Sequence, residues 1–229
     1  MIEAATGLIL RTRPLTDTSL IVHWLTPSLG RIATVARGAR RPKSPFRGQL
    51  DLFYLADFSF ARSRRSELHS LREVSLKQSF PRLRQDLGAL QQAAYGAALV
   101  ELSTESETPL PRAFELMRSL VERLGEHAPK PQLVFAFELK LLEELGLQPD
   151  LAQGHLTAGA REIAMRLQSS DWPMIARLKL TDPQIAELRQ FLHGFLIFHL
   201  GKLPSGRLAA LQGGSILNPK SEIRNPRDE

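Results

Sequence analysis

The 229-residue chain contains no cysteine. Its absence excludes disulfide bonds, thiol catalysis and zinc sites built on cysteine ligands. No apolar run approaches the roughly 18 residues needed to cross a membrane, and the N-terminus lacks the charged-then-apolar pattern of a signal peptide. We therefore expect a cytoplasmic protein with no membrane association.

Motifs of common enzyme classes are also missing. There is no Gly-x-Ser-x-Gly nucleophile motif and no Gly-x-Gly-x-x-Gly dinucleotide motif. Gly201-Lys202 is the one Gly-Lys pair, but Leu196 and Leu203 stand where a phosphate-binding loop needs glycine and Ser or Thr. We interpret this pair as a helix end with a cationic cap.

Residues that often bind metals or move protons are scattered along the chain. His193 and His199 are the closest histidines, and their spacing does not place them on one helical face. Four carboxylates fall on polar faces of expected helices, and we interpret them as solvated surface. They are Glu101, Glu138, Glu143 and Glu144. We predict a protein that is not an enzyme and has no metal or other cofactor.

The first 80 residues show the alternating pattern of short β-strands. Strands are expected at residues 6–12, 20–26, 31–37, 52–60 and 68–76. Residues 26–30 predict a hairpin in which Gly30 is available for positive φ. Five short strands in about 80 residues favour a small barrel, because a sandwich usually has about seven.

After Phe80-Pro81 the pattern becomes helical. Apolar residues three and four apart predict helices over residues 83–100, 111–124, 131–145 and 159–167, and a last long one that begins near Thr181. The expected fold class is α+β. We expect a barrel domain at residues 1–80, an all-α domain at 81–212 and a disordered polar tail at 213–229.

Positive charge is concentrated in the barrel region. Residues 1–80 hold 13 Lys and Arg against 6 Asp and Glu, a net charge of +7, whereas residues 81–229 hold 17 against 18, a net charge of −1. Segregation of charge to one segment indicates an anionic partner more strongly than a basic chain as a whole does.

The densest group of cations lies in the connection between the third and fourth strands. Five cations fall within eleven residues that contain no acid: Arg37, Arg40, Arg41, Lys43 and Arg47. Phe46 stands among them and is the aromatic residue most expected to be exposed for stacking on a base. These side chains predict a phosphate-binding loop, although a solubilising surface remains an alternative.

A second basic cluster, Arg62, Arg64 and Arg65, falls in the expected hairpin between the fourth and fifth strands. Barrels of the OB type bind nucleic acids with their first and fourth hairpins and the face of strands 2 and 3. We expect both basic clusters at the mouth of the barrel, with further cations lining one face by their strand parity. Those cations are Arg11, Arg13, Arg31 and Arg37.

Other aromatic residues of this region have less exposed positions. Tyr54, Phe58 and Phe60 share parity on one strand, which is more typical of a barrel core than of a stacking platform. We also interpret Trp24 as a core residue.

Several segments resemble the bacterial recombination-mediator family RecO. They are Gly7-Leu8-Ile9-Leu10-Arg11-Thr12-Arg13 with Leu20-Ile21-Val22, Leu25-Thr26-Pro27 and Gly30-Arg31; Val35–Ser44 with Phe46-Arg47-Gly48-Gln49-Leu50; and Phe137–Leu142 with Leu145-Gly146 and Pro149-Asp150-Leu151. The likeness covers roughly residues 1–205, and over the N-terminal segment both order and spacing match. Ser205-Gly206-Arg207 is similar to the Ser-x-Arg near the end of family members.

The resemblance implies an N-terminal OB-fold and a helical domain. It implies binding of single- and double-stranded DNA, strand annealing, action with RecR, and help to RecA in replacing the single-stranded-DNA-binding protein SSB in the RecF pathway of DNA repair. It also implies that the helical domain binds the acidic C-terminal tail of SSB and that the protein is associated with the nucleoid. Many relatives carry a four-cysteine zinc module after the Pro-Asp-Leu stretch, which this chain lacks.

Two other functions remain open. An interaction adaptor would bind an acidic peptide with its helical domain, and the basicity of its barrel would be incidental. A nuclease would need a cluster of carboxylates or histidines around a metal, which these spacings do not assemble.

Overall fold

The computed structural model describes residues 2–152 and 156–213. It begins with a closed five-stranded barrel: β1 (Ile2–Pro14), β2 (Leu20–Thr26), β3 (Gly30–Ala36), β4 (Leu55–Ala61) and β5 (Leu68–Gln78). The strand order is β1-β2-β3-β5-β4, and β3 and β5 form the one parallel pair among these strands. The five expected strands and the OB-type barrel are confirmed.

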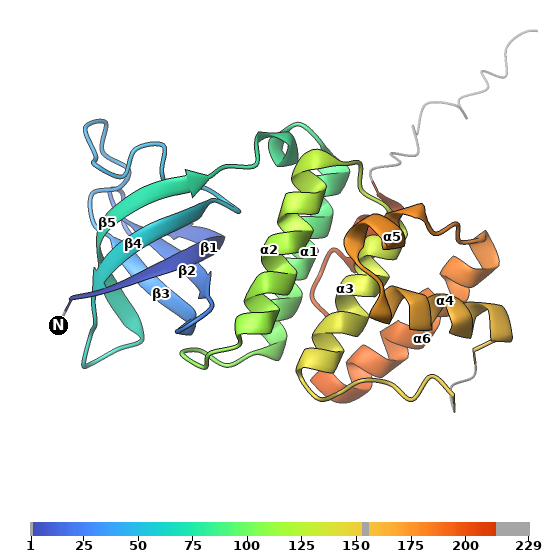
Figure 1. Cartoon of the computed structure of the whole chain (residues 1–229). Helices are drawn as coiled ribbons and strands as arrows, with labels where there is room; N and C mark the ends of the chain where they lie inside the picture. Colours follow the sequence, from blue (N-terminus) through green and yellow to red (C-terminus); the bar gives the residue numbers. More distant parts are fainter. Residues whose placement is uncertain (1, 153–155, 214–229) are drawn as a thin grey trace, which may run out of the picture.

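Helices follow the barrel and continue away from it (Figure 1). They are η1 (Pro81–Arg84), α1 (Leu87–Ser103), α2 (Pro111–Glu126), α3 (Pro131–Glu144), α4 (Ala158–Ser169), α5 (Trp172–Arg177), α6 (Asp182–Leu200) and α7 (Arg207–Gln212). The helix expected from residue 83 begins instead at Leu87, because Asp86 caps its N-terminus by accepting a hydrogen bond from the backbone of Ala89. The expected tail lies outside the described residues except for Gly213.

The interior of the barrel forms one apolar core. Trp24 stacks on Phe58 with ring centroids 4.0 Å apart, and Trp24 Nε1 donates a hydrogen bond of 2.9 Å to Thr34 Oγ1. Phe58 and Phe60 are 3% and 0% exposed. The prediction that Trp24, Phe58 and Phe60 are core residues is confirmed, so none of them offers a face to a base.

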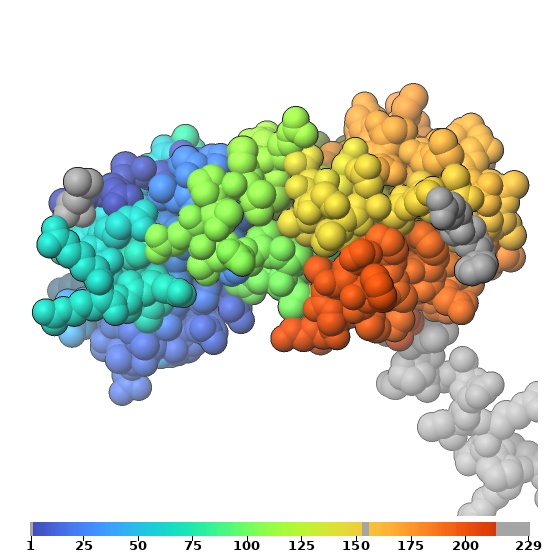
Figure 2. All heavy atoms as spheres, turned by 90° about the horizontal axis from the view of Figure 1, so that it is seen from below, coloured from blue at the N-terminus to red at the C-terminus, as the bar shows by residue number. Residues whose placement is uncertain are grey.

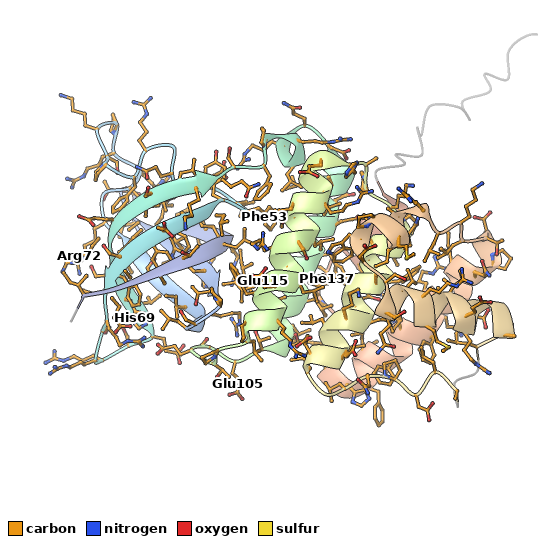
Figure 3. The ribbon with its side chains drawn as sticks, viewed as in Figure 1. Phe53, His69, Arg72, Glu105, Glu115 and Phe137 are labelled. Atoms are coloured by element: carbon orange, nitrogen blue, oxygen red, sulfur yellow. The ribbon has the colours of Figure 1, made fainter. Side chains whose placement is uncertain are left out.

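A second core joins the barrel to the helices. Leu8, Leu10 and Leu25 turn away from the barrel interior and pack with the helical residues. Phe53, at the junction of the barrel and the helices, belongs to the same core (Figure 3). In space-filling view the helices α1 and α2 lie directly against the barrel (Figure 2). One outer face of the barrel is therefore covered by the chain itself, and this limits where a large ligand could bind.

Candidate nucleic-acid interface

The connection between β3 and β4 contains the basic loop, residues 37–47. Successive turns order it: Arg41 N donates to Gly38 O, Ser44 N to Arg41 O and Arg47 N to Ser44 O, at 3.0 to 3.2 Å. All five of its cations are exposed, and none forms an ion pair within the part of the chain that the structure describes. They are Arg37, Arg40, Arg41, Lys43 and Arg47. Their charge is unneutralised and faces solvent.

The basic loop is fastened to the barrel at two points. Arg40 N donates a hydrogen bond of 3.0 Å to Thr18 O in the β1–β2 connection, and Arg40 Nη1 donates to Thr16 O at 3.2 Å. Phe46 is 7% exposed and belongs to the barrel core. The expectation that Phe46 is an exposed stacking residue is wrong, because its ring anchors the loop instead.

The second basic cluster lies at the other end of the barrel. The basic loop precedes β4 whereas residues 62–65 follow it, and a strand of seven residues spans about 23 Å. Side chains with nitrogen tips extend from the barrel at both ends (Figure 3). The expectation of one mouth that carries both clusters is therefore wrong, since the strand separates them.

Arg62 differs from its two neighbours. Its guanidinium makes a bidentate ion pair with Glu3, at 2.7 and 3.0 Å, and a further ion pair with Glu107. The hydrogen bond with Glu3 is the main cause of the raised pKa of Arg62. Arg62 is thus already neutralised, while Arg64 and Arg65 are exposed and make no ion pair with any described residue.

The cations of β1 and β3 line a separate cleft of about 410 Å³, together with Glu101 of α1 and Glu107 of the α1–α2 connection. The structure brings Arg11, Arg13 and Arg31 together there, as the parity of the strands predicted, but leaves Arg37 outside. Arg11 Nη2 lies 3.3 Å from Glu101 Oε1, so part of this charge is neutralised internally.

Burial in this cleft lowers the pKa of two side chains, those of His23 and Arg31. Burial, followed by the charges of Arg11, Arg13 and Arg31, lowers the pKa of His23 to about 4. Arg31 donates from Nε to Thr104 Oγ1 at 2.8 Å, and burial lowers its pKa. Arg11 and Arg31 of this cleft are therefore held by contacts within the chain.

The α1–α2 connection holds the helices on this face. Glu107 N donates to Arg31 O at 2.8 Å, and Glu107 Oε1 lies 3.1 Å from Nε2 of the buried His69. Figure 3 places His69 and this connection at the same end of the barrel. Gly30 has φ +65, and a Cβ there would lie 2.0 Å from Thr108 O. Gly30 is a turn residue as predicted, whereas nothing in the sequence indicated Glu107 as a contact of the barrel. The interpretation of Glu101 as solvated surface is wrong, because its side chain is 17% exposed and pairs with Arg11.

The described residues of the helical part include a buried ionic network. Glu138 is 0% exposed and forms a bidentate pair with Arg207, from Oε1 to Nε at 2.6 Å and from Oε2 to Nη2 at 2.8 Å. Tyr95 OH donates to Glu138 Oε1 at 2.6 Å. The interpretation of Glu138 as solvated surface is wrong, because its carboxylate anchors α7 to α1 and α3.

The described part of the chain has neither a metal-binding cluster nor a membrane-spanning helix, and its Gly-Lys pair ends a helix. No group of three or more His, Cys, Asp or Glu side chains that could hold a metal occurs among the described residues. Gly201 has φ 72 and ends α6, so Gly201-Lys202 is a helix end as interpreted from the sequence. Over residues 2–152 and 156–213, no helix is both long and apolar enough to span a bilayer.

The fold places the chain in the class of OB-fold proteins that carry a C-terminal set of helices. Residues 1–80 match the family described as Recombination protein O N terminal, and residues 84–158 match that described as Recombination protein O C terminal. The chain belongs to the recombination protein O family, RecO. The resemblance seen in the sequence is confirmed.

Individual relatives cover much of the chain. The DNA repair protein RecO of Anaeromyxobacter sp. (strain K) is 30% identical in an alignment that covers 90% of this chain and 92% of that protein. The DNA repair protein RecO of Bacillus subtilis (strain 168) is 32% identical over 151 residues, 66% of this chain and 58% of that protein. That of Symbiobacterium thermophilum is 35% identical over 147 residues, 64% of this chain and 57% of that protein. This similarity supports a role in DNA repair.

Proposed function

We propose that this protein is a DNA-binding and strand-annealing recombination mediator that catalyses no covalent step. It acts with RecR and helps RecA replace SSB on single-stranded DNA, within the RecF pathway and in the cytoplasm at the nucleoid. Residues 1–80 act as the DNA-binding domain and residues 81–212 as the helical domain. Both single- and double-stranded DNA are substrates for binding.

One observation carries the proposal: the basic loop holds five exposed cations that form no ion pair with any described residue, on the barrel of a RecO family chain. Lys and Arg that displace the counterions of phosphates supply most of the affinity in binding without sequence preference. Cations that already have partners within the chain contribute less to the affinity for DNA. We therefore rank the basic loop first, Arg64 and Arg65 second, and the cleft with Arg11, Arg13 and Arg31 last.

The test uses charge reversal at three positions of the basic loop. The variant Arg40→Glu/Arg41→Glu/Lys43→Glu is compared with Arg177→Glu/Lys179→Glu/Lys202→Glu, which makes the same charge change at exposed sites of the helical part. Fluorescence anisotropy with a labelled oligonucleotide measures affinity. We expect the affinity to fall tenfold or more for the first variant and less than about threefold for the second. Both variants weaken the long-range attraction, which depends on total charge, but only the first removes cations that contact phosphates.

The mediator activity needs its own assay. Complementary strands coated with SSB are mixed with the protein, with and without RecR, and duplex formation is followed. We expect annealing by the wild type and by the helical-part variant, and its loss in the basic-loop variant. Equal affinity and equal annealing by both variants would contradict the proposal.

A second candidate function, capture of the acidic SSB tail, is favoured by a groove of about 600 Å³ between α6 and α7. Leu203, Leu208 and Leu211 line it, together with the exposed Arg189 and no carboxylate among its described lining residues. Apolar walls beside a cation fit a peptide that alternates apolar and acidic residues.

Pull-down with intact SSB and with SSB that lacks its acidic tail separates the two functions. If capture of SSB dominates, Arg189→Glu and removal of the tail both abolish recruitment to SSB-coated DNA, while affinity for bare DNA is unchanged. If DNA binding dominates, recruitment survives both changes and fails in the basic-loop variant.

A further inference from the structure

The basic loop encloses a pocket of about 410 Å³. Phe46, 7% exposed, forms part of its wall together with Leu20 and Leu50, which pack against the barrel core beside it. These side chains belong to the core, so the apolar wall is fixed before a ligand arrives. An apolar wall does not stabilise a bound phosphate group, but it does stabilise an aromatic ring that packs its flat face against it.

Three arginines line the same pocket, Arg40, Arg41 and Arg47, and its lining contains no carboxylate among the described residues. Arg40 is held through Thr16 O, and Arg47 Nη1 donates to Pro42 O at 3.3 Å. Two of the three are therefore positioned by the chain itself. Guanidinium groups bind phosphates through paired N–H donors and also stack on aromatic rings.

We infer that this pocket binds one unstacked base of single-stranded DNA, with the adjacent phosphate held by the arginines at its rim. A nucleotide supplies both the aromatic ring and the negative charge that the pocket complements. The inference rests on the proposed DNA binding and adds a contact that duplex DNA cannot make, because its bases are stacked and paired. Recognition is independent of sequence, since every base has an aromatic face.

The test compares two labelled oligonucleotides of equal length and charge, one of thymidines and one whose sugars carry no base. Binding by charge alone gives them equal affinity. Binding through the pocket favours the thymidine strand by about fivefold or more, which corresponds to about 1 kcal/mol, the low end of stacking on a protein surface. The full chain is used throughout, and affinity is measured by anisotropy.

A pocket-filling variant assigns the preference to this pocket. Ala39 lines the pocket and carries no charge, so Ala39→Phe occupies the space while every cation is kept. Ala4→Phe, at an exposed position on β1, makes the same change elsewhere on the barrel. We expect Ala39→Phe to lower the preference for the thymidine strand over the base-free strand below about twofold, and Ala4→Phe to retain this preference.

A readout on the wild type does not depend on a variant that folds. A single 2-aminopurine within the strand should brighten on binding, since the fluorescence of this base increases when it leaves its neighbours. Equal affinity for both strands, or a preference that survives in a folded Ala39→Phe protein, would overturn the pocket and leave the charge-based proposal intact. Failure to bind either strand would overturn the proposed function itself.

Discussion

The pairing of Glu138 with Arg207 can be tested by removing the cation. Arg207→Met keeps much of the length and apolar character of the side chain but leaves the carboxylate of Glu138 buried with only the hydroxyl of Tyr95 as a donor. Burial by itself lowers the pKa of Arg207, but the hydrogen bonds and charge of Glu138 outweigh it, and the pKa is raised. The guanidinium is thus charged at any ordinary pH.

The magnitude follows from the burial of both groups. The side chains of Arg207 and Glu138 are 8% and 0% exposed. Removing one member of such a pair costs about 3–5 kcal/mol, because the other charge stays buried without compensation. For a urea m-value of about 3 kcal/mol/M, the unfolding midpoint falls by about 1 M or more.

Two controls accompany the urea measurement. Arg166→Met breaks the Arg166–Glu162 pair, whose side chains are 58% and 63% exposed, and should cost less than about 0.5 kcal/mol. Glu138→Gln/Arg207→Met removes both charges and should lose less stability than Arg207→Met alone. A loss below about 1 kcal/mol for Arg207→Met would refute the idea that these groups form a desolvated pair.

Three further outcomes are expected at the junction of the barrel and the helices. The pKa of His23 is about 4 in the folded chain against 6.5 in the unfolded chain, so the free energy of unfolding falls as the pH drops from 6.5 toward 4. His23→Gln should make this fall shallower when the free energy of unfolding is measured with urea at several pH values. An unchanged dependence on pH would contradict the lowered pKa of His23. Gly30→Ala should lower the free energy of unfolding by several kcal/mol, because its Cβ would lie 2.0 Å from Thr108 O. Gly48 also has positive φ, +75, but no atom lies within 4 Å of a Cβ there, so Gly48→Ala should lower it only by the about 1–2 kcal/mol of a left-handed backbone. Equal losses for the two variants in thermal unfolding would contradict the close contact at Gly30. Glu101→Gln removes the carboxylate that pairs with Arg11, so it should raise affinity for DNA by about two- to fivefold in anisotropy at low salt. A decrease would show that Glu101 does not compete with phosphates for Arg11.

The barrel could be predicted from the sequence because its interior follows a period of two. β1 and β2 depart from this pattern, since Leu8, Ile9 and Leu10 are all buried, and so are Trp24, Leu25 and Thr26. Ile9 faces the barrel core while Leu8 and Leu10 face the helices, and a register shift lies between Ile9 and Arg11. A strand buried on both faces carries no alternation, so the sequence could not reveal which face the helices cover.

The site was predicted in part for a related reason. Local composition identified the basic loop, and its cations are exposed as expected. The contacts that neutralise Arg62 come from Glu3 and Glu107, which are distant in sequence. The burial of Phe46 and Glu138 likewise depends on how elements meet in space, which the spacing of residues along the chain does not encode.

The central claim is that cations of the basic loop contact phosphates, and the salt dependence of binding tests it most directly. Each contact to single-stranded DNA contributes about −0.7 to the slope of log affinity against log salt concentration, so five contacts predict a slope of about −3.5. Arg40→Gln/Arg41→Gln/Lys43→Gln should make this slope less steep by about 2, while Arg177→Gln/Lys179→Gln/Lys202→Gln should leave it unchanged. A slope near zero for the wild type, or an unchanged slope in the loop variant, would contradict the account.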